Sequence, residues 1–306
     1  MLDQPIIYSK AGIALFHGVS WNIDAAWREI YPGLKLCRMQ GSGVQKTYEE
    51  LCKNRLVDDG EPFYYEVYAS ITPESSGFYY QNGYGHSQAD RLANMIAIAT
   101  GQPPFMCRTF SPVVESTGNQ ISTEELYWIG EQNEFLLRES PKIDEACVSA
   151  ISKMYSAYER MWAVDKSSSR LVSAQIYFYN AWRSMYIEQI CLNLAITAEM
   201  LFSPNGRNEI THQLAFNMAK FSETHPAKRL ELYRKIKKFY GLRSAVVHGG
   251  LPDQGKIIDP TVEMFSLIAT VLKRILTDDE LIEVFNDNKN RDAYLTSLLF
   301  DTSNAV

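Results

Sequence analysis

The second half of the sequence is divided into helices by strong start and stop signals. Ser122–Glu125 reads STEE, a capping box in which a hydroxyl and a carboxylate pair with free backbone N–H groups. Thr277–Glu280 (TDDE) repeats that pattern, and a proline follows a capping-type residue at Ser140–Pro141 and at Asp259–Pro260. Short loops between such helices favour antiparallel packing. We therefore predict that residues 122–306 form an all-α bundle of about six helices.

The limits of three helices in this half can be predicted more closely. Residues 171–202 keep a helical spacing up to the turn sequence SPNG, which predicts one long helix, and a shorter helix is expected at 208–222. Pro226 should begin the next helix, since proline lacks the N–H that a first helical turn leaves unpaired. Gly249 and Gly250 should end it, because glycine readily adopts the left-handed conformation found at helix C-termini.

Residues 1–121 are mixed in character and predict an α+β domain. The run PFYYEVYASI (62–71) is typical of a strand, and residues 104–114 predict a second one. Residues 87–101 have helical spacing and end at a glycine, while Asn82-Gly83 is a turn signal. We assign this domain a recognition or regulatory role.

The spacing of the cysteines and the distribution of apolar residues exclude several classes of protein. The five cysteines are far apart and include no CxxC pair, so they indicate neither a zinc site nor a disulfide framework. No signal peptide opens the chain, and the longest apolar run, 190–202, is interrupted by Asn193, Thr197 and Glu199. We expect a cytoplasmic protein that needs no metal ion or cofactor and does not insert into a membrane.

One segment carries a local excess of positive charge, although the chain as a whole has a net charge of −6. Seven Lys or Arg side chains lie between Pro226 and His248, and only Glu231 opposes them. A local basic face attracts phosphates even on an acidic protein, so we predict that this helix guides RNA. A solvated helix face, or a surface that meets an acidic protein, would carry the same pattern. The predicted RNA-guiding residues are Arg234, Lys237 and Lys238.

At the end of the basic helix, Arg243 and His248 offer the two kinds of group that RNA cleavage requires. RNA supplies its own nucleophile, the 2′-hydroxyl, so the enzyme needs a proton carrier and cations around the phosphate. Histidine carries protons near neutral pH, and arginine binds phosphate oxygens through a planar fork of donors. Ser244 would assist this pair.

The spacing of Arg243 and His248 is a geometric difficulty, because on an ideal helix they point about 140° apart. Three arrangements close the gap: the reach of the arginine, a helix end that loosens at the glycines, or a site shared by two copies. Tyr240 and Ser244 share the stripe of His248, while Glu199 lies within an apolar helix. A buried carboxylate is costly unless paired, so we expect Glu199 to pair with an arginine, with Arg243 as the candidate.

The surroundings of this pair resemble the HEPN family of all-helical domains, specifically its Apea-like branch. An isolated Arg-x4-His pair is common by chance, but here the flanking residues match as well. The resemblance covers about sixty residues, from Leu194–Phe221 into Leu232–Gly250. The matching positions are Glu199, Leu201-Phe202, Glu209-Ile210, Ala215, Ala219, Tyr240, Arg243-Ser244 and His248-Gly249.

The resemblance implies a homodimeric, metal-independent endoribonuclease with a composite site between two copies. Arg243 and His248 would be its catalytic pair, and Ser244 stands where many active members carry Asn, Asp or His. Glu199 and Tyr240 would support the site or bind RNA. Many such domains act as toxins or in antiviral defence, so we expect an RNA substrate and a regulatory or neutralising protein partner. The alternative is a non-catalytic module that senses or binds nucleic acid or protein.

Overall fold

A computed structural model of the chain gives its fold. The described residues are 12–17, 19–42, 44–46, 65–71, 88–104, 106–114, 121–129, 136, 140–163, 169–203, 210–250 and 253–300. The chain divides into two compact units, residues 1–132 with 137–156 and residues 133–136 with 157–306.

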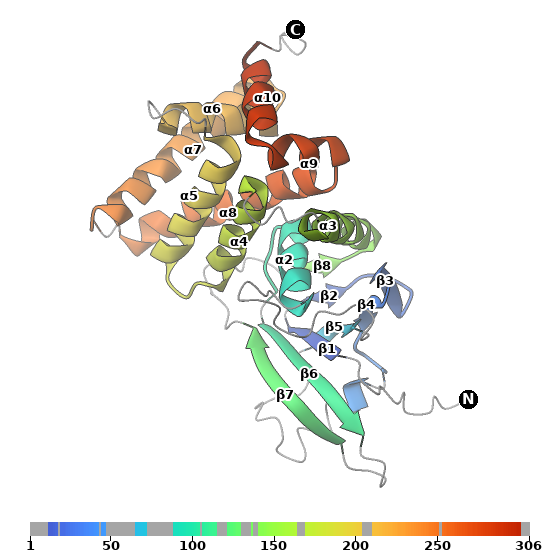
Figure 1. Cartoon of the computed structure of the whole chain (residues 1–306). Helices are drawn as coiled ribbons and strands as arrows, with labels where there is room; N and C mark the ends of the chain where they lie inside the picture. Colours follow the sequence, from blue (N-terminus) through green and yellow to red (C-terminus); the bar gives the residue numbers. More distant parts are fainter. Residues whose placement is uncertain are drawn as a thin grey trace. The chain divides into compact units, whose positions relative to one another are not determined.

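In the described part of the first unit, six strands form one antiparallel sheet in the order β3-β4-β5-β1-β6-β7 (Figure 1). A separate parallel pair joins β2 and β8. Leu15, Leu36 and Val67 on the central strands are buried, and so is Ile96 on helix α2, which contacts β6. The bounds are β1 Gly12–His17, β2 Ser20–Trp21, β3 Trp27–Tyr31, β4 Leu34–Arg38, β5 Tyr65–Ile71, α2 Gln88–Thr100, β6 Met106–Val114, β7 Ile121–Ile129 and β8 Lys142–Ile143.

The predicted α+β character of the N-terminal part is confirmed. The strands predicted at 62–71 and 104–114 correspond to β5 and β6, and the helix predicted at 87–101 corresponds to α2. The two strands are predicted correctly by their β-branched and aromatic residues, and the helix by the spacing of its apolar residues. The turn predicted at Asn82-Gly83 lies outside the described residues.

The helix start predicted at Ser122–Glu125 is wrong, because these residues belong to strand β7. Ser122 pairs with Val113 of β6, and Thr123 pairs with Pro112. The surrounding run ISTEELYWI is rich in β-branched and aromatic residues, and the neighbouring strand supplies the backbone partners that a capping box would otherwise provide. The sheet therefore extends beyond the domain boundary that we predicted between residues 121 and 122.

The helix start predicted at Ser140–Pro141 is also wrong by several residues. Pro141 precedes β8, and its carbonyl accepts a hydrogen bond of 2.8 Å from the backbone N–H of Ser20. Helix α3 (Glu145–Ala163) begins only after Asp144, whose Oδ1 accepts from the N–H of Cys147 at 2.7 Å. A carboxylate at the N-cap satisfies a free N–H, so Asp144 sets the start of this helix.

The second unit is helical in its described part, as predicted in outline (Figure 1). Apolar side chains of successive helices, among them Phe178, Leu194, Phe202 and Phe265, are fully buried and form its core. Within the described residues, no helix has the combination of length and hydropathy that a bilayer crossing requires. The helices are α4 Arg170–Arg183, α5 Ile187–Phe202, α6 Ile210–Ser222, α7 Pro226–Val247, α8 Gln254–Leu276, α9 Asp279–Asn286 and α10 Asn288–Phe300.

The single long helix predicted over 171–202 is in fact two helices, α4 and α5. Ser184, the C-cap of α4, has an extended backbone with ψ of 136°. Its hydroxyl donates to the carbonyl of Asn180 at 2.6 Å and accepts from Nδ2 of Asn193 at 3.3 Å. Serine competes for backbone partners in this way, which allows a break that hydrophobic spacing alone does not reveal. The helix predicted at 208–222 corresponds to α6, although Glu209 lies outside the described residues.

Two further predicted helix starts are displaced. Helix α8 begins at Gln254 instead of Pro260, because Asp253 is its N-cap and accepts from the N–H of Gly255 at 3.1 Å. Pro260 lies inside the helix. At the second predicted capping box the N-cap is Asp278, not Thr277, since the Asp278 carboxylate accepts from the N–H of Glu280 at 3.0 Å. In each case a nearby aspartate is the stronger cap.

Both predicted ends of the basic helix are confirmed. Pro226 occupies the first turn of α7, and Gly249 has a φ of 76° beyond its C-terminus. The N–H of Gly250 bonds to the carbonyl of Ala245 at 2.9 Å, which uses an acceptor that the last turn leaves free. These local signals place the predicted site residues at the end of a regular helix.

Burial raises the pKa of the Cys191 thiol, in the core helix α5, to about 12. Only the thiolate reacts with alkylating reagents, so near pH 8 the folded protein should leave this residue unmodified. We expect iodoacetamide to label Cys191 only after the protein is unfolded in denaturant, as measured by peptide mass spectrometry. Labelling of the native protein at the rate of an unfolded peptide would contradict this burial.

Candidate functional site

Helix α7 carries most of the predicted site residues, and its faces have different roles. Ile236, Phe239 and Tyr240 are buried and hold the helix against its neighbours α5, α6 and α8. Arg243 is half-buried beside them, whereas Ser244 and His248 are exposed. Near its C-terminus, α7 therefore carries Arg243 at the edge of its buried face, and Ser244 and His248 on its exposed side.

Arg243 forms the ion pair that we predicted with Glu199 of α5. The distance between Arg243 Nη2 and Glu199 Oε1 is 3.6 Å, and the side chains are 34% and 29% exposed. Nε of Arg243 is buried and has no hydrogen-bond partner among the described residues. The contact with Glu199 therefore orients the guanidinium, and the exposed third of the side chain, not the buried Nε, is the part that a further anion can reach.

Tyr240 lies beside this pair and is buried. Its hydroxyl donates to the carbonyl of Ala195 at 3.1 Å. Burial, together with the negative charge of Glu199, raises the pKa of Tyr240 well above its ordinary value, so the phenol remains neutral. Of the two roles predicted for Tyr240, the structure is compatible with support of Arg243 and not with direct binding of RNA.

His248 is the C-cap of α7 and is exposed. Its backbone N–H bonds to the carbonyl of Ser244 at 3.1 Å, and the helix is regular through Val247. Five residues of regular helix turn Arg243 and His248 about 140° apart. The loosened helix end that would have brought them together does not occur, and Arg243 is directed toward Glu199. One chain alone therefore does not gather Arg243 and His248 at a single point.

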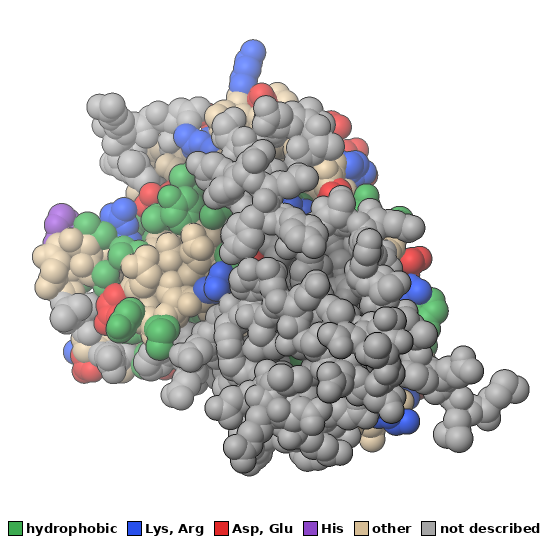
Figure 2. Space-filling view, turned by 60° about the horizontal axis from the view of Figure 1, so that its bottom comes forward, with side chains coloured by type: hydrophobic (Ala, Val, Ile, Leu, Met, Phe, Trp, Pro, Cys, Tyr) green, Lys and Arg blue, Asp and Glu red, His purple; other side chains and the backbone are tan. Residues whose placement is uncertain are grey.

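The basic residues of α7 are less uniformly available than their number indicates. Lys235 Nζ lies 3.4 Å from Glu231 Oε1 and 3.7 Å from Glu263 Oε2. Arg229 donates to the backbone carbonyls of Glu223 and Thr224, just before the same helix begins. Of the predicted RNA-guiding residues, Arg234, Lys237 and Lys238 are all exposed. Figure 2 shows one face of the molecule, on which the described Lys and Arg side chains are scattered among hydrophobic and acidic ones.

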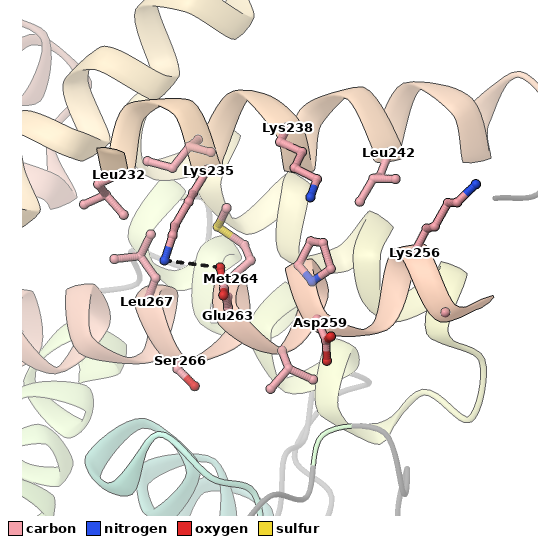
Figure 3. A pocket seen from close by; sticks show the side chains of 14 residues that line it. Leu232, Lys235, Lys238, Leu242, Lys256, Asp259, Glu263, Met264, Ser266 and Leu267 are labelled. Atoms are coloured by element: carbon pink, nitrogen blue, oxygen red, sulfur yellow. Dashed lines mark ion pairs between the residues drawn. The ribbon is translucent and has the colours of Figure 1, made fainter. Parts of the chain in front are cut away.

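Lys237 and Lys238 lie on different flanks of α7. Lys238 points into a groove of about 990 Å³ between α7 and α8, next to Leu242 and Pro260 (Figure 3). The ammonium of Lys237 instead lies 5.5 Å from the centre of the Tyr233 ring. None of the predicted catalytic residues lines the groove, so the groove and the candidate catalytic residues are separate features.

Contacts between helices add two residues that the sequence did not reveal. His212 of α6 and Tyr233 of α7 are joined by a hydrogen bond of 2.7 Å between Nδ1 and the hydroxyl. Their rings are nearly perpendicular, with centres 5.7 Å apart. On its own helix His212 contacts the Phe216 ring, with centres 6.5 Å apart, whereas the pair with Tyr233 depends on the packing of α6 on α7.

No metal site emerges from the described residues, where no group of three His, Cys, Asp or Glu side chains is close enough to hold an ion. Comparison with known proteins does not identify the chain: it matches no protein-family profile, no curated protein and no solved structure.

Proposed function

We propose that the chain is a HEPN-type endoribonuclease that cuts RNA through the RNA's own 2′-hydroxyl. The proposal rests on the resemblance of the segment from Leu194 to Gly250 and on the state of Arg243. That side chain is 34% exposed, and its guanidinium is oriented by Glu199 at 3.6 Å. An oriented, part-exposed arginine is suited to bind a phosphate.

In the proposed reaction, the 2′-oxygen attacks the adjacent phosphorus and the bond from phosphorus to the 5′-oxygen breaks. The 2′-hydroxyl loses a proton and the leaving 5′-oxygen gains one, so a group that carries protons is needed. His248, exposed at the end of α7, would take this role. Arg243 would stabilise the charge on the phosphate, and Ser244 would donate a hydrogen bond beside them.

Two copies of the chain would share the site. Within one chain Arg243 and His248 point in different directions, but a two-fold axis brings the same surface of both copies together. Arg243 of one copy would then face His248 of the other. This arrangement uses the regular helix end as it stands and requires no rearrangement of α7.

The chemistry of the products tests the proposal. Purified protein is incubated with single-stranded RNA and with transfer RNA, and the ends of the fragments are mapped. Attack by the 2′-oxygen yields 2′,3′-cyclic phosphate and 5′-hydroxyl ends, is blocked by a 2′-deoxy substitution at the cut position, and continues in EDTA. Expression of the wild type should also be more toxic than expression of His248→Ala.

Two results would contradict the proposed function. Fragments with 5′-phosphate ends would require another nucleophile, and RNA binding without cleavage under all conditions would favour the non-catalytic alternative. In that alternative Arg243→Ala leaves the cellular effect of the protein unchanged.

A further inference from the structure

We propose that His212, Tyr233 and Lys237 form a nucleotide-binding subsite that holds single-stranded RNA at a distance from the cleaved bond. This inference rests on the proposed ribonuclease function, and it names where the rest of the substrate lies. The three residues are called the α6–α7 cluster below. Their defining contacts are the hydrogen bond between His212 and Tyr233 and the position of Lys237 near the Tyr233 ring.

The α6–α7 cluster lies on the same flank of α7 as Ser244 and His248, whereas Arg243 points away from it. At 100° per residue, Tyr233, Lys237, Ser244 and His248 fall within about 60° of one another around the helix axis. Tyr233 and Ser244 are eleven positions apart in the sequence, so along a helix they are separated by about 16 Å. A single RNA strand that follows this flank would cover the distance with a few nucleotides. The cluster and the residues at the end of α7 would thus contact different parts of one strand.

The chemistry of the α6–α7 cluster suits a nucleotide. His212 is exposed and Tyr233 is half-buried, so an imidazole and part of a phenol ring are accessible to a base. Bases stack on such rings with little dependence on sequence. The hydrogen bond to Tyr233 uses His212 Nδ1, and the ammonium of Lys237 lies over the Tyr233 ring, 5.5 Å from its centre. The imidazole and the ammonium can donate to phosphate oxygens next to a stacked base.

The hydrogen bond to Tyr233 also gives His212 a defined orientation. A free surface imidazole would lose side-chain entropy on binding a ligand, whereas a ring already held at 2.7 Å from its partner loses less. The perpendicular arrangement of the two rings leaves their faces pointing in different directions. These features distinguish the cluster from the isolated exposed lysines elsewhere on α7.

Binding measurements in a non-cleaving background test the subsite. The full chain with His248→Ala is titrated with fluorescent single-stranded RNAs of increasing length. Adding Tyr233→Leu, which retains an apolar side chain, should weaken binding of the longer RNAs about 5- to 100-fold, as expected for the loss of one stacked base. Tyr233→Phe keeps the ring and should bind more tightly than Tyr233→Leu.

A matched pair of lysines provides the control. Lys237→Ala should weaken binding and lower the slope of log affinity against log salt by about 0.7, the value for one lost phosphate contact on a single strand. Lys235→Ala, on the same helix but paired with Glu231 and Glu263, should change neither quantity. If Tyr233→Leu fails to fold, Lys237→Ala and His212→Ala, both at exposed positions, carry the test.

Cleavage by the otherwise wild-type chain separates failure of the subsite from failure of the proposed function. Tyr233→Leu should raise KM for long RNAs and leave the turnover of the shortest cleavable RNA unchanged. If the wild type cuts RNA but Tyr233→Leu and Lys237→Ala bind long RNA as tightly as their parent, the subsite is refuted and the function stands. If the chain binds an acidic peptide through Lys237 but no RNA, both proposals fail.

Discussion

Copies of the chain that carry Arg243→Ala, mixed with copies that carry His248→Ala, should recover RNA cleavage that neither variant shows alone. Each substitution by itself should lower kcat/KM at least about 100-fold, the effect of removing one preorganised charge or proton carrier from a transition state. In the mixture, a dimer with one copy of each variant contains one site with both groups intact. Random pairing makes half of the dimers mixed, with one working site of two, so activity should recover to about a quarter of the wild-type value.

The expectation follows from the direction of the two side chains. Arg243 is tied to Glu199 of α5 at 3.6 Å, while His248 caps the exposed end of a helix that is regular through Val247. A site assembled from one chain would need Arg243 to leave its partner and reach around the helix. A site assembled from two chains needs neither movement.

Two control variants make the result specific. Arg243→Lys keeps the positive charge but loses the planar fork, so it should retain only part of the activity. Arg234→Ala removes an exposed cation of the same helix and should change KM modestly without changing kcat. The experiment measures initial cleavage rates of single variants and of mixtures refolded together. Active single variants, or mixtures no more active than either component, would contradict a site that pairs Arg243 and His248 across two copies.

The parts of the fold that the sequence predicts correctly are those with local causes. Pro226 and Gly249 define α7 because each residue acts through its own backbone geometry. Strands β5 and β6 follow from their β-branched and aromatic residues. Strand β7 was missed since the partner that makes it a strand, β6, is a separate segment, and the local capping signal at Ser122 points the other way.

The candidate site likewise contains one contact that the sequence predicts and one that it does not. The pairing of Glu199 with Arg243 was predictable because a carboxylate in an apolar helix requires a partner, whatever the fold. The contact between His212 and Tyr233 was not, since it depends on how α6 packs on α7. The break between α4 and α5 at Ser184 was also missed, because serine occurs within helices as well as at their ends. Local sequence signals identify residues that need partners, but they do not identify which helix provides each one.

Arg291 of α10 is a buried charged residue, and we expect its replacement to change the stability of the helical unit. Its side chain is fully buried, with 0% exposure, and it connects α10 to the end of α5. Nη1 donates to the carbonyl of Met200 at 3.0 Å and Nη2 to that of Ser203 at 3.3 Å, at the C-terminal end of α5. Arg170, at the start of α4, donates to the same Ser203 carbonyl.

The charge of Arg291 is balanced by its neighbour in the sequence. Asp292 Oδ1 accepts from Nη2 of Arg291 at 2.6 Å and from Nε at 3.2 Å. Burial, with a smaller contribution from the positive charge of Arg291, lowers the pKa of Arg170. Arg291 thus supplies donors to the end of α5, where backbone carbonyls have no partner within the helix, and a counter-charge to Asp292.

Replacing Arg291 by methionine, which has a similar length but no charge or donors, should lower the free energy of unfolding of the helical unit by about 3–5 kcal/mol. The loss arises because the Met200 and Ser203 carbonyls lose donors and the part-buried Asp292 loses the counter-charge of Arg291. Urea titration followed by circular dichroism measures it. The matched control is Arg160→Met, which breaks the exposed pair of Arg160 with Asp279 and should cost less than about 1 kcal/mol. Equal effects of the two substitutions would mean that Arg291 does not hold α5 and α10 together.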